Sequence, residues 1–447
     1  MSLRCLPLCL RRLAAGLVLL AAACAHQPAG VSVATLNDCD ASGATALPPE
    51  SVSLAVACPV APGAETGAAA MRAALSHVAA HGLDPAPYEA LADAGGVRDA
   101  WLLAATHLRH GVLDPDTLAP RTAPDLTLAP LLTGIALTGD TDAFTAALDR
   151  AAPTRSEYAA LRAELSRQRA LSTLLPSPED RAAAETRIAT LRINLERLRW
   201  LPSDYGERYV LANIPAFEVS AVSADGAVER HSAIFGKLST QTPEFSDQIE
   251  YVIFNPWWEV PPSIARRDKL PQFRASPGDV TRLGYRVYDH DGNAIDPSTI
   301  DWATVPASPF PYQIRQAPGA ANALGQVKIM FPNPDNVYLH DTPEKALFDK
   351  EVRAFSSGCI RVKDPLGLAE WVLNDMPDWD RTAIDAAVAT GKETRVDLDT
   401  TIPVHVVYLT ASPGADGEIV YSADVYERDA AVLDALNAAA IAPPSGT

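Results

Sequence analysis

The chain has 447 residues, which is enough for two to four domains with their own cores. Its 37 Lys and Arg against 55 Asp and Glu leave a net charge of −18. This balance excludes a typical nucleic-acid-binding protein, which needs a basic face. It also provides no general attraction for an anionic polymer, so such a substrate would have to be held by charges local to a cleft.

The N-terminus begins like that of an exported protein. Three arginines precede an apolar run over residues 13–23 that is too short to span a bilayer as an ordinary helix. We therefore expect residues 1–24 to be a signal peptide. Residues 21–24, Ala-Ala-Ala-Cys, form an imperfect lipoprotein signal, which predicts a lipid on Cys24, whereas cleavage within Ala-Cys-Ala is the alternative. Both alternatives predict a periplasmic protein, and only a lipid on Cys24 would attach it to the membrane.

Export affects how the remaining cysteines are interpreted. Residues 25–65 are rich in Ala, Gly, Ser and Pro, which predicts a flexible lead-in. Cys39 and Cys58 lie in this segment and could close a loop of about 20 residues, which would contribute about 3 kcal/mol. A reduced pair is equally compatible with the sequence. Cys359 has to stay unpaired if it is to act chemically.

Residues 66–200 are predicted to form a helical domain. At 81–85, His-Gly-Leu-Asp-Pro places Gly where one helix can end and Asp-Pro where the next can begin, and 110–115 repeats the pattern. His81 and His110 are therefore expected to be helix-end residues rather than metal ligands. Thr154 and Ser177 are the expected caps of two further helices.

After residue 200 the pattern changes to short β-rich segments bounded by Pro, Gly or Asn, which predicts a mainly antiparallel sheet over 201–425. The fold class is therefore α+β. A Pro-rich stretch at 262–324 interrupts the strands, and within it 289–293 is interpreted as a hairpin turn rather than a calcium loop. Residues 426–447 are expected to form a C-terminal helix and tail.

One cysteine lies in a setting that suits nucleophilic chemistry. Cys359 follows Ser356, Ser357 and Gly358, and His340 lies nineteen positions upstream. A cysteine nucleophile needs a neighbouring base, and we expect His340 to hold Cys359 as a thiolate. Glycine before the nucleophile lets main-chain N–H groups surround a reacting carbonyl. The sequence contains no His-Glu-x-x-His, no paired Cys-x-x-Cys and no phosphate loop, so no metal and no cofactor are predicted.

These motifs resemble those of the L,D-transpeptidases, the YkuD-type cysteine enzymes of the bacterial cell wall. The chain reads His-Asp-Thr-Pro at 340–343 and Ser-Ser-Gly-Cys-Ile-Arg-Val at 356–362, forms that resemble the larger YcbB-type branch. Further matching segments lie at 194–200, 213–215, 242–246, 255–258, 316–319 and 324–325. The resemblance covers roughly 190–425 and implies a helical scaffold domain, a β-sandwich-like catalytic domain and a capping subdomain at 262–324.

The resemblance also implies roles for individual residues. It makes Cys359 the nucleophile and His340 the base, and it assigns the orientation of the imidazole to the main-chain carbonyl of Asp341. The groups expected to form the oxyanion hole or to contact substrate are Gly358, Ser357, Arg361, Tyr338, Trp258 and Asn333.

The expected reaction is attack on a tetrapeptide stem of peptidoglycan, release of the terminal D-alanine and transfer of the acyl group to an amine of a second stem. The product is a 3→3 cross-link. Alternatives that use the same nucleophile are L,D-carboxypeptidase activity, D-amino-acid exchange and attachment of a lipoprotein to the wall. Carbapenem β-lactams are the expected inhibitors.

Overall fold

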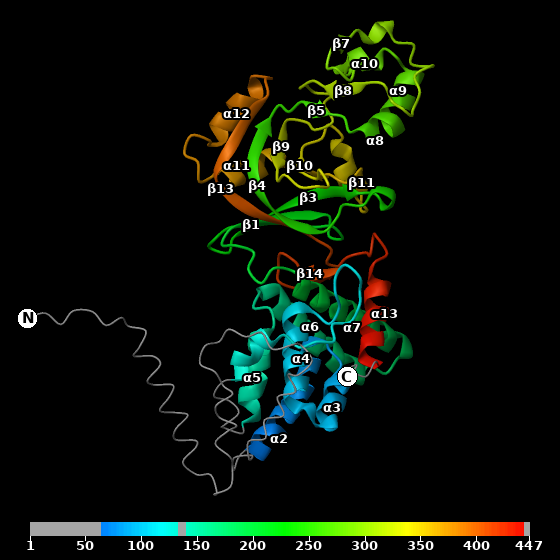
Figure 1. Ribbon diagram of the computed structural model, residues 1–447. Coiled ribbons are helices and arrows are strands. Elements are labelled where there is room, and N and C mark those ends of the chain that lie inside the picture. The colour runs from blue at the N-terminus through cyan, green and yellow to red at the C-terminus, as the bar shows by residue number, and fades with distance from the viewer. Residues whose placement is uncertain (1–63, 133–139, 442–447) are drawn as a thin grey trace, which may run out of the picture. The chain divides into compact units, whose positions relative to one another are not determined.

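The described chain begins with a run of helices up to α7, and the strands, with further helices among and after them, follow from β1 onward (Figure 1). The computed structural model describes residues 64–132 and 140–441. The signal segment, Cys24 and the pair Cys39 and Cys58 lie outside these ranges. Within them, no helix is both long enough and apolar enough to cross a membrane.

The first part is helical, as the sequence predicted. Its elements are α2 (Ala64–Ala74), η2 (Leu75–His81), α3 (Ala86–Leu91), η3 (Ala92–Gly96), α4 (Val97–His110), η4 (Leu126–Leu132), α5 (Thr141–Ala151), α6 (Ser156–Leu174) and α7 (Pro178–Trp200). η2 ends at Gly82, whose φ of 83° favours glycine. α7 begins after Ser177, whose hydroxyl accepts the Asp180 N–H at 3.2 Å. Thr154, however, is not a cap, because α6 begins after Arg155 with no side-chain cap.

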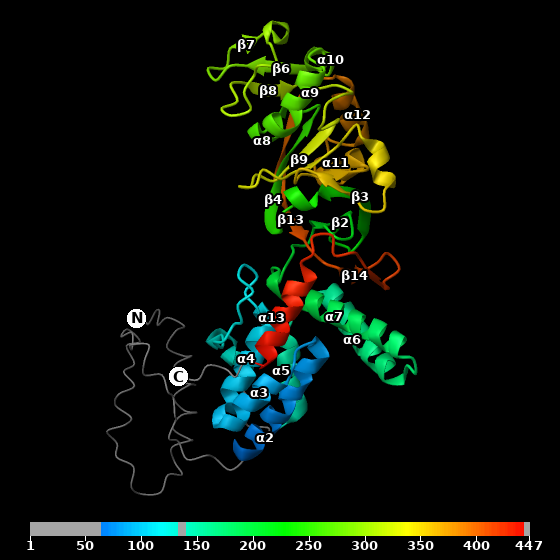
Figure 2. The same cartoon turned by 90° about the vertical axis from the view of Figure 1, so that its right-hand side faces the viewer.

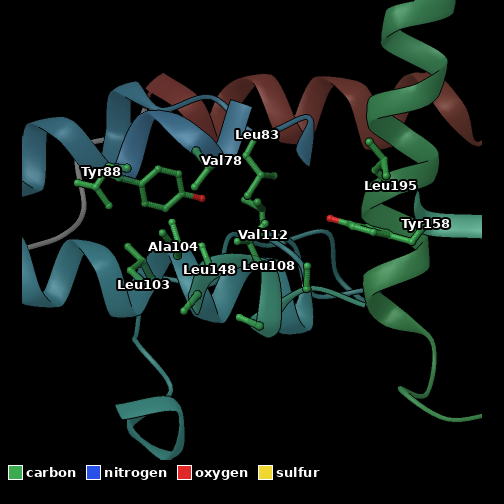
Figure 3. Close-up of a cluster of buried hydrophobic side chains, with 14 of the residues drawn as sticks. Val78, Leu83, Tyr88, Leu103, Ala104, Leu108, Val112, Leu148, Tyr158 and Leu195 are labelled. Carbon is green, nitrogen blue, oxygen red and sulfur yellow. The ribbon is translucent and has the colours of Figure 1, made fainter. Parts of the chain in front are cut away.

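A single apolar core joins these helices. Trp101 and Leu102 of α4 are fully buried, and Figure 3 shows Val78 and Tyr88 pointing toward Leu103 of the same helix. Residues from the end of the chain belong to this core as well: Val407, Leu409, Ala411, Val432 and Leu436. The C-terminal segment therefore completes the helical core. It includes the hairpin of β14 (Ala411–Pro413) and β15 (Ile419–Tyr421), and α13 (Asp429–Ile441).

The second part is built around a nine-stranded sheet. Its strands are β1 (Tyr209–Asn213), β2 (Glu218–Val222), β3 (Val228–Gly236), β4 (Phe245–Phe254), β9 (Val327–Met330), β10 (Leu339–His340), β11 (Ala354–Ser356), β12 (Ile360–Val362) and β13 (Thr394–Val407). The order is β11-β3-β12-β10-β9-β4-β13-β1-β2, and β2 also pairs with β3, so the sheet closes on itself. Most pairings are antiparallel, but β1–β13, β10–β12 and β11–β3 are parallel.

Alternating side chains of this sheet form a second core with two helices. α11 (Pro365–Leu373) starts at Asp364, whose carboxylate accepts the Gly367 N–H at 3.0 Å, and its Leu368 and Leu373 are fully buried. α12 (Arg381–Ala389) contributes Ile384 to the same core. α11 contacts β9 and α12 contacts β4, and both helices lie on one side of the sheet (Figure 2).

The expected insertion forms a small layer with its own core. It contains β5 (Trp258–Glu259), α8 (Pro262–Ile264), η6 (Ala265–Lys269), α9 (Leu270–Ala275), α10 (Asp279–Arg282), β6 (Tyr285–Tyr288), β7 (Ala294–Ile295), η7 (Pro297–Thr299) and β8 (Gln313–Gln316). Its strands pair in the order β5-β8-β6-β7. Phe273, Tyr285 and Trp302 are buried in its core. Residues 289–293 connect β6 to β7 as the predicted hairpin turn.

Two buried histidines of the helical core should make stability depend on pH. Burial lowers the pKa of His81 to about 3 and that of His107 to about 4, whereas both titrate near 6.5 in an unfolded chain. The unfolded chain therefore binds more protons between these values. We expect the free energy of unfolding to fall by about 1.4 kcal/mol per pH unit for each histidine as the pH decreases from 6.5 toward 4.

Chemical denaturation at several pH values measures this dependence. His107→Gln should make the decrease shallower, whereas His290→Gln, at an exposed position, should leave it unchanged. A free energy of unfolding that stays constant between pH 6.5 and 4.5 would contradict the assignment.

Candidate active site

Cys359 lies in a tight turn between β11 and β12. The Ser356 hydroxyl donates to the Cys359 carbonyl at 2.6 Å and accepts the Gly358 N–H at 3.1 Å. Gly358 has a φ of 124°, a conformation that any residue with a Cβ disfavours. The turn therefore requires the small polar side chain and the glycine that precede the cysteine. The Gly358 N–H is already used inside the turn, which differs from its expected role in an oxyanion hole.

The buried Thr242, in the loop between β3 and β4, supports this turn. The Thr242 hydroxyl donates to the Gly358 carbonyl at 2.8 Å and accepts the Gly236 N–H at 2.9 Å. The Tyr426 hydroxyl in turn accepts the Thr242 N–H and donates to the Gly236 carbonyl at 2.7 Å. Thr242 lay in a motif that the sequence singled out, but nothing in the sequence pointed to Tyr426.

His340 is placed by strand register. β10 pairs with β9 so that His340 lies opposite Lys328, and it pairs with β12 so that His340 lies beside Arg361. Residues directly opposite on neighbouring strands project from the same face. The imidazole therefore has a cationic side chain on each side. Tyr338 precedes it by two residues and has its ring centroid 5.5 Å from that of His340.

Asp341 acts through its main chain and holds the loop with its side chain. Its carbonyl accepts a hydrogen bond from His340 Nδ1 at 2.5 Å, the contact that the sequence analysis assigned to the main chain. Because a carbonyl only accepts, Nδ1 carries the proton and Nε2 is left with its lone pair. The carboxylate accepts from the Gln326 and Thr342 N–H groups and from Lys345 Nζ at 2.6 Å.

Cys359 and His340 line the same cavity, which has a volume of about 1020 Å³. The cavity lies between the sheet and the inserted layer, and Trp258, Tyr338, Lys328 and Arg361 also line it. The half-buried Cys359 thiol donates to the Asn336 carbonyl at 3.5 Å. The two reacting groups therefore share one space, but in this conformation the thiol is directed to the main chain.

The electrostatic state differs from the expected thiolate. Burial, then the charges of Arg361 and Lys328, lower the pKa of His340 to about 3. Burial also raises the pKa of the Cys359 thiol, although Tyr338, Lys328 and Arg361 act in the opposite direction. The resting pair is thus a neutral thiol and a neutral imidazole. Proton transfer then has to accompany attack on a substrate instead of preceding it.

The remaining expected contact residues fall into two groups. Ser357, Arg361, Tyr338 and Trp258 line the cavity. Ser357 also accepts a hydrogen bond from Arg267 of the inserted layer at 2.8 Å, and Arg361 pairs with Glu344. Asn333 does not line the cavity. Its amide donates to the carbonyls of Phe331 and Val337 and accepts the Val337 N–H, so it closes the turn before β10 instead of facing a substrate.

A second titratable cluster lies in the helical part. His77 and His81 each have Nε2 within 3.1 Å of one Asp149 carboxylate oxygen. From the sequence, His81 was expected to be a helix-end residue rather than a metal ligand. The Arg162 guanidinium occupies the same oxygen at 3.0 Å, and the Tyr158 hydroxyl contacts His81 Nδ1 at 3.0 Å. A cation next to the carboxylate disfavours a metal ion, so the cluster functions as a hydrogen-bonded link between helices.

A thiol and a neutral imidazole in one cavity can serve as a nucleophile and a base. Comparison with known proteins gives the family. Residues 207–406 match the YkuD model of the L,D-transpeptidase catalytic domain, and residues 61–165 match the scaffold domain. The chain therefore contains a YkuD-type L,D-transpeptidase catalytic domain that follows a helical scaffold domain.

A Haemophilus influenzae protein with the provisional name L,D-transpeptidase is 35% identical over 239 residues. These residues make up 54% of this chain and 48% of that protein, so the chain spans about half the length of this relative. The resemblance inferred from the motifs is thus confirmed at the level of the family.

The raised pKa of Cys359 predicts slow alkylation near neutral pH. Iodoacetamide reacts with the thiolate, whose fraction stays small until the pH approaches the raised pKa. We expect the rate of carbamidomethylation, followed by intact mass, to be still rising at about pH 9. Cys359→Ala corrects for the other cysteines. A rate that is already constant at pH 7 would indicate a preformed thiolate.

Thr242, which supports the turn around Cys359, should stabilise the folded protein. Thr242→Val keeps the shape of the side chain but leaves the Gly358 carbonyl and the Gly236 N–H without their partner. We expect the free energy of unfolding to fall by about 1–3 kcal/mol. Thr390→Val removes an exposed hydroxyl that bonds only locally and serves as the control. Equal stability of both variants would remove Thr242 from this role.

Proposed function

We propose that this protein is a peptidoglycan L,D-transpeptidase that forms 3→3 cross-links through a Cys359 thioester. The observation that carries the proposal is that Cys359 and His340, whose Nε2 keeps its lone pair, line one cavity of a YkuD catalytic domain. The match to the L,D-transpeptidase catalytic domain indicates which kind of bond is attacked. The cavity contains the thiol and the imidazole that this attack needs.

The first half-reaction begins when the thiol turns from Asn336 toward His340. Nε2 takes the thiol proton as sulfur attacks the carbonyl of the L-centre of the diamino acid at position three of the donor stem. The Cys359 N–H, for which the described residues provide no partner, is positioned to stabilise the oxyanion. The imidazolium then protonates the departing amine of D-alanine, and the acyl group stays on sulfur.

In the second half-reaction an amine of a neighbouring stem attacks the thioester. His340 removes a proton from this amine and the thiolate leaves, which restores the neutral pair. The inserted layer lies over the cavity and contacts the nucleophile turn through Arg267 and Ser357. A covered thioester is less exposed to water, which favours transfer to an amine over hydrolysis.

We further propose that the protein acts in the periplasm and is anchored by a lipid on Cys24. The apolar run over residues 13–23 and the cysteine that follows it support this location. Peptidoglycan stems are found in that compartment, so the location and the proposed substrate are consistent. Carbapenem β-lactams should acylate the same thiol.

Purified protein incubated with disaccharide-tetrapeptide should produce dimers linked through two position-three residues, detected by mass spectrometry. Carbapenem should add its mass to the intact wild-type protein. Cys359→Ala should abolish both results, and His340→Gln should reduce dimer formation by at least a hundredfold because general-base catalysis contributes about 10²–10⁴.

Glu370→Gln, an exposed change on α11, is the matched control. Release of D-alanine without dimers would identify a carboxypeptidase instead. A carbapenem adduct that persists in Cys359→Ala would place the nucleophile elsewhere.

A further inference from the structure

Some of the cationic side chains that line the cavity form an ion pair with a carboxylate, and others do not. Four of them line it: Arg267, Lys269, Lys328 and Arg361. Arg267 pairs with Asp268 at 2.7 Å, and Arg361 pairs with Glu344. Neither lysine has an ion pair with any carboxylate in residues 64–132 and 140–441. Two ammonium groups are therefore available to an anionic ligand.

Of the two lysines, Lys328 is the one beside the reacting groups. It lies directly opposite His340 in the β9–β10 register. Its charge acts on both His340 and Cys359, whereas no such effect comes from Lys269. Lys269 instead lies over the rings of Trp258 and Tyr285, each centroid 5.4 Å from Nζ.

The surroundings of Lys328 leave its charge incompletely compensated. Its Nζ lies 4.0 Å from the centroid of the Tyr338 ring, a cation–π contact that stabilises the ammonium only in part. Burial lowers the pKa of Lys328, while Cys359 and then Glu393 and Glu259 oppose this, the two carboxylates from beyond ion-pair distance. A partly desolvated ammonium without a counterion is unfavourable, and a carboxylate at this point would relieve it.

We propose that Lys328 binds the terminal carboxylate of the donor peptide and so restricts the enzyme to peptides with a free C-terminus. This proposal rests on the proposed function. In the residue that is released, one carbon separates the carboxylate from the scissile nitrogen. When the thiol is in contact with the scissile carbonyl, this carboxylate lies within a few ångströms of the sulfur, and Lys328 is the unpaired cation in that region.

Binding of the carboxylate at Lys328 should also affect how strong a base His340 is. Lys328 and Arg361 flank His340 and disfavour its protonated form. A bound carboxylate offsets part of this positive charge, so the imidazole becomes a better base when the correct donor is present. A peptide that lacks the carboxylate leaves His340 as weak a base as in the empty cavity.

Binding measurements on Cys359→Ala test the site without turnover. Calorimetry compares a tetrapeptide with a free C-terminus and the same peptide as its carboxamide. We expect at least tenfold tighter binding of the acid, which Lys328→Gln should abolish and Lys328→Arg should partly restore. Lys269→Gln, a matched loss of charge in the same cavity, should keep the ratio. An acid-to-amide ratio that is unchanged in Lys328→Gln, or is near one in the parent, overturns the proposal.

Turnover separates this proposal from the function. In the active enzyme, kcat/KM for release of the terminal residue should favour the acid at least tenfold, and this preference should vanish in Lys328→Gln. Lys328→Gln should still be alkylated at Cys359 by neutral iodoacetamide, which shows an accessible thiol, but more slowly than wild type because the Lys328 charge no longer lowers the pKa of the thiol. Acid-selective binding without any turnover would refute the transpeptidase but support the carboxylate site, whereas equal turnover of acid and amide would refute the site alone.

Discussion

The site depends on the pairing of β10 with its two neighbours. This strand has only two residues, yet its register with β9 and β12 fixes which side chains flank His340. A shift by one residue would turn the imidazole to the opposite face of the sheet. The turn closed by Asn333 before the strand and the Asp341 carboxylate after it hold that register. Polar contacts at both ends thus compensate for the shortness of the strand.

Much of this arrangement could be predicted from the sequence because the motifs are local. The turn around Cys359 needs Ser356 and Gly358 at fixed offsets, and the contact from His340 to the next carbonyl joins adjacent residues. The change from helical to β-rich patterns near residue 200 likewise reflects local periodicity. Such features appear in a sequence directly, as does the helix start at Ser177.

Other features depend on contacts between segments that are far apart in the sequence, and these features could not be predicted from it. Tyr426 supports the nucleophile turn from 67 positions beyond Cys359. The role of Lys328 follows from the strand pairing, since nothing near it in sequence is unusual. The expectation of a thiolate was also incomplete, because burial shifts the Cys359 and His340 pKa values in directions that no motif encodes.

The late position of β13 and of the segment after it should delay folding during synthesis. β13 lies between β4 and β1, and Tyr426 and the residues that complete the helical core follow it. A ribosome therefore has to release the chain at least as far as Tyr426 before the sheet can close and the cysteine turn can be supported. Loss of the chain from residue 418 onward would leave both halves of the protein unfinished, so a truncated product should be degraded instead of persisting with an exposed reactive sulfur.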